Sequence, residues 1–456
     1  MSLIIPANTL SSGGFAVDNS ARFNSGSSDS LTRTFSTPTN AKKFTISQWV
    51  KRSKINESQI LLNQGADYYY FVHNNVIDFE TTTGRLKTNR LFRDTNAWYH
   101  IVIVVDTTLG TADDRIKMFI NGVQETSFGS RTNPSLNANF ANFNSANEHS
   151  IAKRQSASDM FLNGYLAEQV FLDGTSAAIT DLGEFDEDSG IWKPIDVSGL
   201  TAGTNGFYLD FKASGNLGND VFGGTDLTEN NLTAVDQSTD TCTNNFATYN
   251  VLLPTKPDTF SEGNTKITQS GNSWDTTYST IGVNTGKWYM EVKWESGSQM
   301  SPGFSTSSIF ELNPSFTKPT DNPTGGGAIY TMYSNGSVYR NNSANSYGTG
   351  ISSGNIQMLA MDLDNNKFYW GQNGTWFNSA NPVTNSNGYA IESGDQGSTW
   401  HFHMGVYGSG NRFGNFGSPA FAISSGNQDG DGYGNFEYAV PSGYYSLCTK
   451  NLAEYG

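Results

Sequence analysis

Three carboxylates near the middle of the chain have a spacing that suits acid–base chemistry. Glu184, Asp186 and Asp188 alternate in the stretch GEFDED, so a β-strand would place all three on one face. Glycosidases with a sandwich fold use two such carboxylates, roughly 5–5.5 Å apart in retaining enzymes. The stretch lacks the alternating apolar residues that anchor a core strand. We therefore expect a solvated acidic loop here, with a glycosidase pair as the alternative.

A second acidic stretch, near the C-terminus, has the spacing of half a calcium loop. Asn427, Asp429 and Asp431 stand at alternate positions in NQDGDGYGNFEY, and a glycine follows. These residues match ligand positions 1, 3 and 5 and the glycine at position 6 of a helix-loop-helix site. The twelfth position is Tyr438 instead of glutamate, and no flanking helices are predicted. We expect an exposed polar turn before the last strand, and a non-helical calcium site is the alternative.

Two histidines alternate in the stretch WHFHMGV. His401 and His403 would share one face of a strand, while Trp400, Phe402 and Met404 would share the other. Two imidazoles with this spacing can chelate a metal, but the sequence marks no third ligand. We expect the two histidines on the wetter, solvent-facing side of a strand. No Ser-His-Asp or Cys-His arrangement can be assembled from the sequence, so we expect no enzymatic activity.

The elements that would position these residues are predicted to be strands. Alternation in KFTISQWVKR places Phe44, Ile46 and Val50 on one face, and Trp49 indicates that the other face is partly covered too. Further along, apolar runs at residues 101–105 and 116–120 predict two strands. Asn-Gly follows the second run, and this pair is the strongest short-range signal for a hairpin.

The same order of elements recurs in the second half of the chain. Strands are predicted at residues 356–361 and 367–370, and Asn373-Gly374 follows the second one. Two copies of strand, Asp-containing loop, strand and Asn-Gly turn indicate two domains of related architecture.

Composition supports an all-β protein and argues against several partners. Only 15% of the residues are charged and 48 of 456 are glycine, which is typical of a chain with many turns and little helix. The net charge of −15 leaves no basic stripe for nucleic acid or for an anionic membrane surface. No apolar run approaches the roughly 18 residues that would span a membrane, so we expect no membrane insertion.

The predicted organisation has three parts. Residues 1–175 are expected to form a first sandwich and residues 256–456 a second. Between them, residues 176–255 are too rich in aromatic side chains for a flexible linker. We expect this segment, here called the strap, to pack on the first sandwich. The boundary to the second sandwich is predicted near Pro254 to Pro257.

Several stretches resemble known families of sandwich domains. FTISQWVKRS, WYHIVIVVD, FINGV and YLAEQVFLDG are similar to laminin-G or concanavalin-like lectin domains. GKWYMEVKWE, LAMDLDNNKFYWGQNGTW and FEYAVPSGYYSLC resemble SPRY-type domains of bacteriophage particle proteins. The strap, through GEFDEDSGIWKPI, GTNGFYLDF and TNNFATYNVL, resembles a segment found with such domains in tailed phages, especially aquatic ones.

The resemblance implies two concanavalin-like (jelly-roll) antiparallel β-sandwiches in a virion structural protein: a tail fibre, a spike or a head decoration. We expect a non-enzymatic protein on the virion surface, made in the host cytoplasm, that binds host-surface polysaccharide. The alternatives are a purely structural decoration or tail-connecting protein and, third, a glycoside hydrolase that acts on host polysaccharide.

The resemblance also implies a metal site and further partners. Laminin-G-like domains often hold calcium at the rim of the sandwich, where Asp106, Asp113 and Asp114 fall here. No cofactor is expected, and calcium, at this rim or at the Asn427 turn, is the alternative. Other virion proteins and further copies of the chain are the expected partners, because phage fibres and decorations are symmetric assemblies. The sequence assigns no individual carbohydrate-binding residue.

Overall fold

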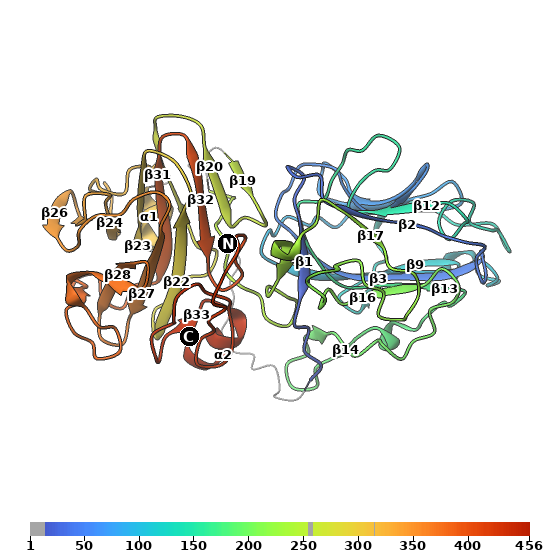
Figure 1. Ribbon diagram of the computed structural model, residues 1–456. Coiled ribbons are helices and arrows are strands. Elements are labelled where there is room, and N and C mark those ends of the chain that lie inside the picture. The colour runs from blue at the N-terminus through green and yellow to red at the C-terminus, as the bar shows by residue number, and fades with distance from the viewer. Residues whose placement is uncertain (1–13, 254–258, 314) are drawn as a thin grey trace. The chain divides into compact units, whose positions relative to one another are not determined.

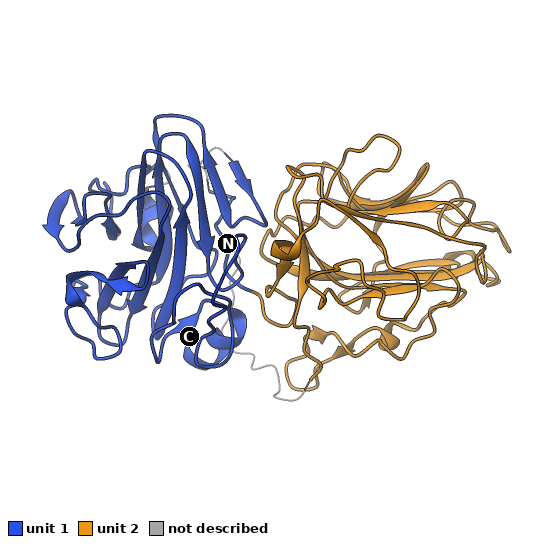
Figure 2. Cartoon of the chain, viewed as in Figure 1, with its two compact units in different colours: residues 1–9, 246–456 blue, residues 10–245 orange. Residues whose placement is uncertain are grey.

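The computed structural model describes residues 14–253, 259–313 and 315–456. Within these residues the chain forms two compact units (Figure 2). Residues 14–245 form the unit drawn in orange, which we call the first unit, and the described residues from Phe246 onward form the unit drawn in blue, which we call the second unit. The boundary predicted near Pro254 to Pro257 lies outside the described residues.

The first unit is a sandwich of two antiparallel sheets (Figure 1). The β3 sheet contains, in spatial order, β10 (Val123–Gln124), β9 (Ile116–Ile120), β8 (Trp98–Asp106), β3 (Lys43–Arg52), β13 (Gly164–Asp173), β1 (Ser20–Phe23) and β18 (Gln237–Ser238), and β16 (Phe207–Leu209) pairs with β13. The facing β5 sheet contains β11 (Phe128–Thr132), β7 (Arg85–Thr88), β6 (Ile77–Glu80), β5 (Asp67–Phe71), β4 (Gln59–Gln64), β12 (Glu148–Ile151), β2 (Ser30–Thr34) and β17 (Thr228–Asn230).

Apolar side chains from both sheets meet between them. Phe44, Ile46 and Val50 of β3 join this core, as their alternation predicts. Trp49 points to the opposite face, where it is also buried, against Trp192 and other side chains. The prediction that both faces of this strand are covered is therefore confirmed.

Residues 176–245 of the strap cover the outer face of the β3 sheet. Their short elements include η2 (Ile179–Asp181), β14 (Glu184–Phe185), β15 (Trp192–Lys193) and η3 (Ala234–Asp236). Leu182, Val197 and Tyr208 pack against Val102 and Val170 of the sheet. The strap also supplies β16, β17 and β18, so it completes both sheets of the first unit.

The second unit is also a two-sheet sandwich. The β22 sheet contains β19 (Thr259–Ser261), β20 (Lys266–Gln269), β32 (Gly410–Asn415), β22 (Lys287–Trp294), β27 (Ile356–Asp362), β28 (Lys367–Gln372) and β29 (Thr375–Trp376); β30 (Tyr389–Ala390) pairs with β28, and β33 (Tyr445–Ser446) pairs in parallel with β22. The facing β31 sheet contains β21 (Trp274–Tyr278), β31 (Trp400–Tyr407), β23 (Gln299–Thr306), β24 (Ile329–Met332), β25 (Ser337–Arg340) and β26 (Ser343–Ser346).

Helices are few and short in both units. The described ones are η1 (Ala112–Asp114), α1 (Ser308–Leu312), η4 (Phe377–Ser379) and α2 (Thr449–Tyr455), besides the two in the strap. The predicted all-β fold of two antiparallel sandwiches is confirmed. Across the described ranges, no helix has both the length and the apolar character needed to cross a membrane.

Both predicted hairpins form at their Asn-Gly pairs. Asn121 and Gly122 connect β9 to β10 with φ values of 48° and 77°. Asn373 and Gly374 connect β28 to β29 with φ values of 48° and 81°. Positive φ at both central residues is what a type I′ turn requires, and asparagine and glycine tolerate it best.

Candidate functional site

The carboxylates of GEFDED build a tight turn. β14 and β15 pair as a small hairpin, and Asp186 Oδ1 accepts hydrogen bonds from the backbone N–H groups of Asp188 (3.2 Å) and Ser189 (2.9 Å). Lys193 Nζ lies 3.2 Å from both Asp186 Oδ2 and Glu184 Oε1. The hydrogen bonds from Ser189, together with the Lys193 contact, lower the pKa of Asp186 to about 2. A glycosidase acid needs a raised pKa, so this carboxyl group is tuned in the opposite direction.

The stretch with the spacing of half a calcium loop forms a hairpin, and Asp429 connects it to the C-terminal residues by hydrogen bonds. Asp429 Oδ1 accepts hydrogen bonds from the backbone N–H groups of Asp431 (3.1 Å) and Tyr433 (2.9 Å). Its Oδ2 accepts from the Ser446 N–H of β33 and from Asn451 Nδ2 of α2, both at 2.9 Å. Both oxygens of this buried carboxylate are therefore engaged by protein donors.

The other two predicted calcium ligands have partners of their own. Asn427 Nδ2 donates to Ser425 Oγ and to the Glu437 carbonyl oxygen, each at 3.0 Å. Asp431 is exposed and interacts with the Tyr455 hydroxyl. In the part of the chain that the structure describes, no group of three His, Cys, Asp or Glu side chains is arranged to hold a metal ion.

The three aspartates at the predicted rim of the first sandwich are each paired with a different cation. The contacts are Asp106 to Lys43 Nζ (2.8 Å), Asp113 to Arg131 Nε (3.4 Å) and Asp114 to Lys117 Nζ (2.9 Å). Burial raises the pKa of Asp106, but the hydrogen bonds from Lys43 and Thr108 outweigh it, and the pKa is lowered. Each carboxylate is thus neutralised locally by a side chain of the protein.

The two alternating histidines lie inside the second unit. His401 Nδ1 contacts the Ser279 carbonyl oxygen (2.9 Å) and Nε2 contacts Ser307 Oγ (3.1 Å). His403 Nδ1 contacts Ser305 Oγ (2.8 Å) and Nε2 contacts Thr331 Oγ1 (3.0 Å). Burial lowers the pKa of His401 to about 4 and that of His403 to about 3. The prediction of a wetter face is wrong, because α1 covers it and Phe310 packs 5.1 Å from His401.

The face of the β31 sheet that carries His401 and His403 is covered along only part of its length. Gly405 of β31 lies directly beneath Pro319 of the segment that follows α1. Further along the same face come the half-buried rings of Trp274, Tyr333, Tyr339 and Tyr407. We call these four residues the aromatic platform.

Strand register places the platform rings on one face. Trp274 of β21 pairs with Tyr407 of β31, and their ring centroids are 5.5 Å apart. Tyr333 lies 6.1 Å from Trp274 and 5.6 Å from Tyr339. None of these four described side chains packs in the apolar core of the second unit. The rings are therefore available for contacts other than folding.

A polar group lies beside the platform. The Tyr333 hydroxyl donates to Gln299 Oε1 at 2.5 Å, and Gln299 of β23 pairs with Tyr407 of β31. The platform thus combines apolar ring faces with an amide at its edge. This is the combination that fits a sugar ring, which has apolar C–H faces and a rim of hydroxyl groups.

Sequence reasoning missed the platform. Its residues lie on or beside four strands that are far apart along the chain, and each looks like an ordinary strand aromatic. A signal was present at Trp274 and Tyr407, because the alternation of side chains along their strands places both rings on the face away from the core. The pairing of those strands was needed to bring the rings together.

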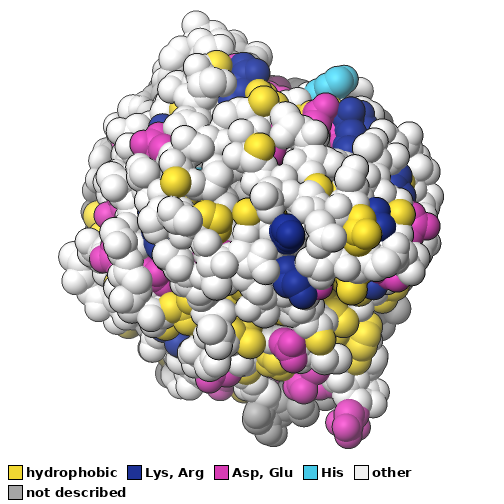
Figure 3. Space-filling view, turned by 90° about the vertical axis from the view of Figure 1, so that its right-hand side faces the viewer, with side chains coloured by type: hydrophobic (Ala, Val, Ile, Leu, Met, Phe, Trp, Pro, Cys, Tyr) yellow, Lys and Arg dark blue, Asp and Glu magenta, His cyan; other side chains and the backbone are white. Residues whose placement is uncertain are grey.

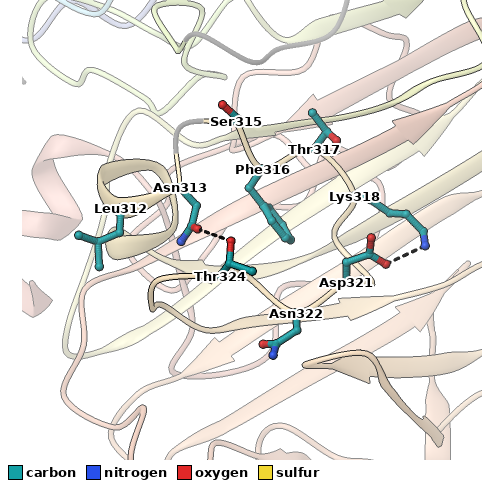
Figure 4. A pocket seen from close by; sticks show the side chains of 9 residues that line it. All are labelled: Leu312, Asn313, Ser315, Phe316, Thr317, Lys318, Asp321, Asn322 and Thr324. Atoms are coloured by element: carbon teal, nitrogen blue, oxygen red, sulfur yellow. Dashed lines mark hydrogen bonds and ion pairs between the residues drawn. The ribbon is translucent and has the colours of Figure 1, made fainter.

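Two pockets in the second unit offer other candidate sites. One, of about 540 Å³, is lined by Tyr347, Trp376, Phe377 and several hydroxyl and amide side chains, and we call it the Trp376 pocket. The other, of about 430 Å³, lies beside α1 (Figure 4). In the second pocket Lys318 pairs with Asp321 at 2.7 Å. Because this ion pair already uses the charged groups of the pocket, the platform and the Trp376 pocket are the better candidates.

The charge distribution fits an uncharged ligand better than a polyanion. On the face shown in Figure 3, Lys and Arg side chains are scattered among acidic and uncharged ones. With 27 basic and 42 acidic residues in the chain, long-range attraction of a phosphate backbone is not expected.

Comparison with known proteins gives one family match. Residues 24–175 match the Concanavalin A-like lectin/glucanases superfamily. No curated protein sequence matches the chain. Similar solved structures are the SPRY domain of human HERC1 (12% identity, TM-score 0.25, 33% of this chain and 87% of that chain), a candidate carbohydrate binding protein from Bacteroides ovatus (12%, 0.35, 47% and 59%) and a SAP-like pentraxin from Limulus polyphemus (11%, 0.27, 36% and 79%). The family match thus gives the first unit a concanavalin A-like lectin/glucanase domain.

Proposed function

We propose that this chain binds carbohydrate through the aromatic platform of its second unit. The observation that carries the proposal is the group of four half-buried rings outside the core, with neighbouring ring centroids 5.5–6.1 Å apart and the Gln299 amide beside them. Aromatic anchors of this kind supply most of the binding energy at many interfaces. The lectin-like match of residues 24–175 supports the same ligand class independently, because it concerns the other unit.

We further propose that the chain is a non-enzymatic structural protein of a tailed-phage virion, a tail fibre, a spike or a head decoration, and that its ligand is host-surface polysaccharide. The resemblance of GKWYMEVKWE and of the strap to phage particle proteins supports this part. Cryo-electron microscopy of the particle, with the position of the chain identified, tests it. A buried position among other particle proteins would favour the purely structural alternative.

The binding proposal is tested with a glycan array and with host lipopolysaccharide. For the best ligand, Trp274→Ala should weaken binding at least about tenfold, because stacking on the central ring is lost. Trp376→Ala is the matched control, since it removes a tryptophan of the same unit from the other candidate site. We expect this variant to bind like the wild type.

The outcomes separate the candidate sites. Unchanged binding by Trp274→Ala together with loss in Trp376→Ala would move the site to the Trp376 pocket. If the wild type binds no glycan and no host cell, the carbohydrate-binding proposal is rejected.

For the hydrolase alternative, we expect the purified chain to release no reducing sugar from host capsule. Release of sugar that stops in Glu184→Ala would contradict the non-enzymatic assignment.

A further inference from the structure

A buried lysine of the first unit contacts a carboxylate and a carboxamide at the same time. Lys51 Nζ, at the end of β3, lies 2.7 Å from Asp240 Oδ2 and 2.7 Å from Asn245 Oδ1. The side chains of Lys51 and Asp240 are each only 1% exposed. Both of its partners come from the end of the strap, just after β18.

Neighbouring groups hold this triad in one geometry. Trp98 Nε1 donates to Asp240 Oδ1 at 3.1 Å, and the Tyr165 ring faces Lys51 Nζ at 5.6 Å. Asn245 Nδ2 donates to the Asn96 carbonyl oxygen at 2.7 Å, which orients the amide oxygen toward the lysine. The amine is therefore held in contact with the amide oxygen of Asn245, one bond away from the carbonyl carbon that it would attack.

Burial also makes the lysine a better nucleophile. It lowers the pKa of Lys51, although the charge of Asp240 opposes the shift. Burial thus favours the neutral amine, and Asp240 Oδ2, 2.7 Å away, is positioned to accept the proton that Nζ releases. A neutral amine can attack a carbonyl carbon, and an adjacent carboxylic acid can donate a proton to the nitrogen that leaves.

We propose that Lys51 and Asn245 form an intramolecular isopeptide bond, with Asp240 as the catalytic acid and base. Asp240 takes a proton from Lys51 Nζ, whose lone pair then attacks Asn245 Cγ. Asp240 delivers that proton to Nδ2, which leaves as ammonia, and the carboxylate then takes the second proton that the new amide nitrogen releases. One C–N bond forms and one breaks, so no oxidant, reductant or further reactant is needed.

The bond would join the first large strand of the β3 sheet to the last residue of the first unit. Lys43, on the same strand, provides a comparison. It contacts Asp106 at 2.8 Å, but this ion pair includes no asparagine side chain with which the lysine could react. The inference goes beyond the proposed sugar binding and does not depend on it.

Mass spectrometry of the purified full-length chain tests the proposal. The intact mass should be lower than the sequence mass by one molecule of ammonia, and a tryptic digest should contain a branched peptide that joins the segments around Lys51 and Asn245. Lys51→Arg, Asp240→Asn and Asn245→Ser should each keep the full mass expected for the variant. Lys43→Arg is the matched control and should still lose ammonia.

Circular dichroism of the variants shows whether each one is folded. A folded Asp240→Asn chain with no branched peptide would assign the carboxylate its role in the reaction. A wild-type chain that keeps the full sequence mass after prolonged incubation, and yields no branched peptide, would overturn the proposal and leave a buried ion pair. Ammonia loss that persists in Lys51→Arg would overturn it as well, since the loss would then arise elsewhere.

Discussion

Glu168 is a buried carboxyl group with a single hydrogen-bond donor. Its Oε2 accepts from the Tyr208 hydroxyl at 2.5 Å, while its Oε1 has no partner among the described residues. The residue sits in an irregularity of β13 with a φ of 47°. Burial raises the pKa of Glu168 to about 7; nearby Asp210 adds to the shift, and Lys212 and the Tyr208 hydrogen bond oppose it.

This shift predicts a specific pH dependence for the first unit. In the unfolded chain a glutamate titrates near pH ~4.3, so between pH ~4.3 and about 7 Glu168 is protonated in the folded chain but ionised in the unfolded chain. Its contribution to the free energy of unfolding is fully present below pH ~4.3 and is lost as the pH rises through about 7. The free energy of unfolding should fall by roughly 3 kcal/mol from this group across that range.

Denaturant titrations of the wild type and Glu168→Gln, at several pH values, measure this contribution. The variant should lack the fall, so the difference between the two proteins should vary with pH. Glu184→Gln, a change at an exposed carboxylate, is the control and should keep the wild-type slope. Parallel pH profiles for wild type and Glu168→Gln would contradict the prediction.

At the scale of elements, the Asp429 hairpin holds the end of the chain. Its carboxylate joins the loop to both β33 and α2. Asp429→Ala should lower the free energy of unfolding of the second unit by about 2–4 kcal/mol, because buried donors lose their acceptor. Thermal and denaturant unfolding measure the loss, and hydrogen exchange should show α2 exchanging faster.

Asp431→Ala is the matched control, because this residue is exposed, and we expect a change within about 0.5 kcal/mol. Since protein donors occupy both oxygens of Asp429, neither calcium nor EDTA should shift the melting temperature. A stabilisation by calcium that Asp431→Ala abolishes would restore the calcium interpretation of this loop.

Local sequence signals predicted elements better than they predicted sites. The Asn121-Gly122 hairpin followed from two residues whose backbone preferences match one turn type. The aromatic platform could not be predicted in this way, because Trp274 and Tyr333 come from strands whose neighbours are set by sheet topology. The burial of His403 was missed for a similar reason: alternation identifies two faces of a strand, but not a segment that covers the second one.

At the scale of the whole molecule, residues 176–245 of the strap belong to the first unit, while its described residues from Phe246 onward belong to the second. A fragment of residues 1–245 should express as a soluble protein with cooperative unfolding. A fragment of residues 1–175 should aggregate, because it exposes Val102, Val170 and Leu172 and leaves β1 and β2 without their neighbours β18 and β17. Solubility and size-exclusion chromatography compare the two. A soluble, folded 1–175 fragment would instead support the domain boundary predicted from sequence.

The late arrival of β17 and β18 has a consequence for synthesis on the ribosome. Ser30 pairs with Asn230, and Ser20 pairs with Ser238, so the two sheets cannot close until nearly the whole first unit has emerged. Contacts so distant along the chain make folding slow, since the ends of a long loop must meet first. The nascent chain should therefore expose unpaired strand edges for many seconds and depend on chaperones during that interval.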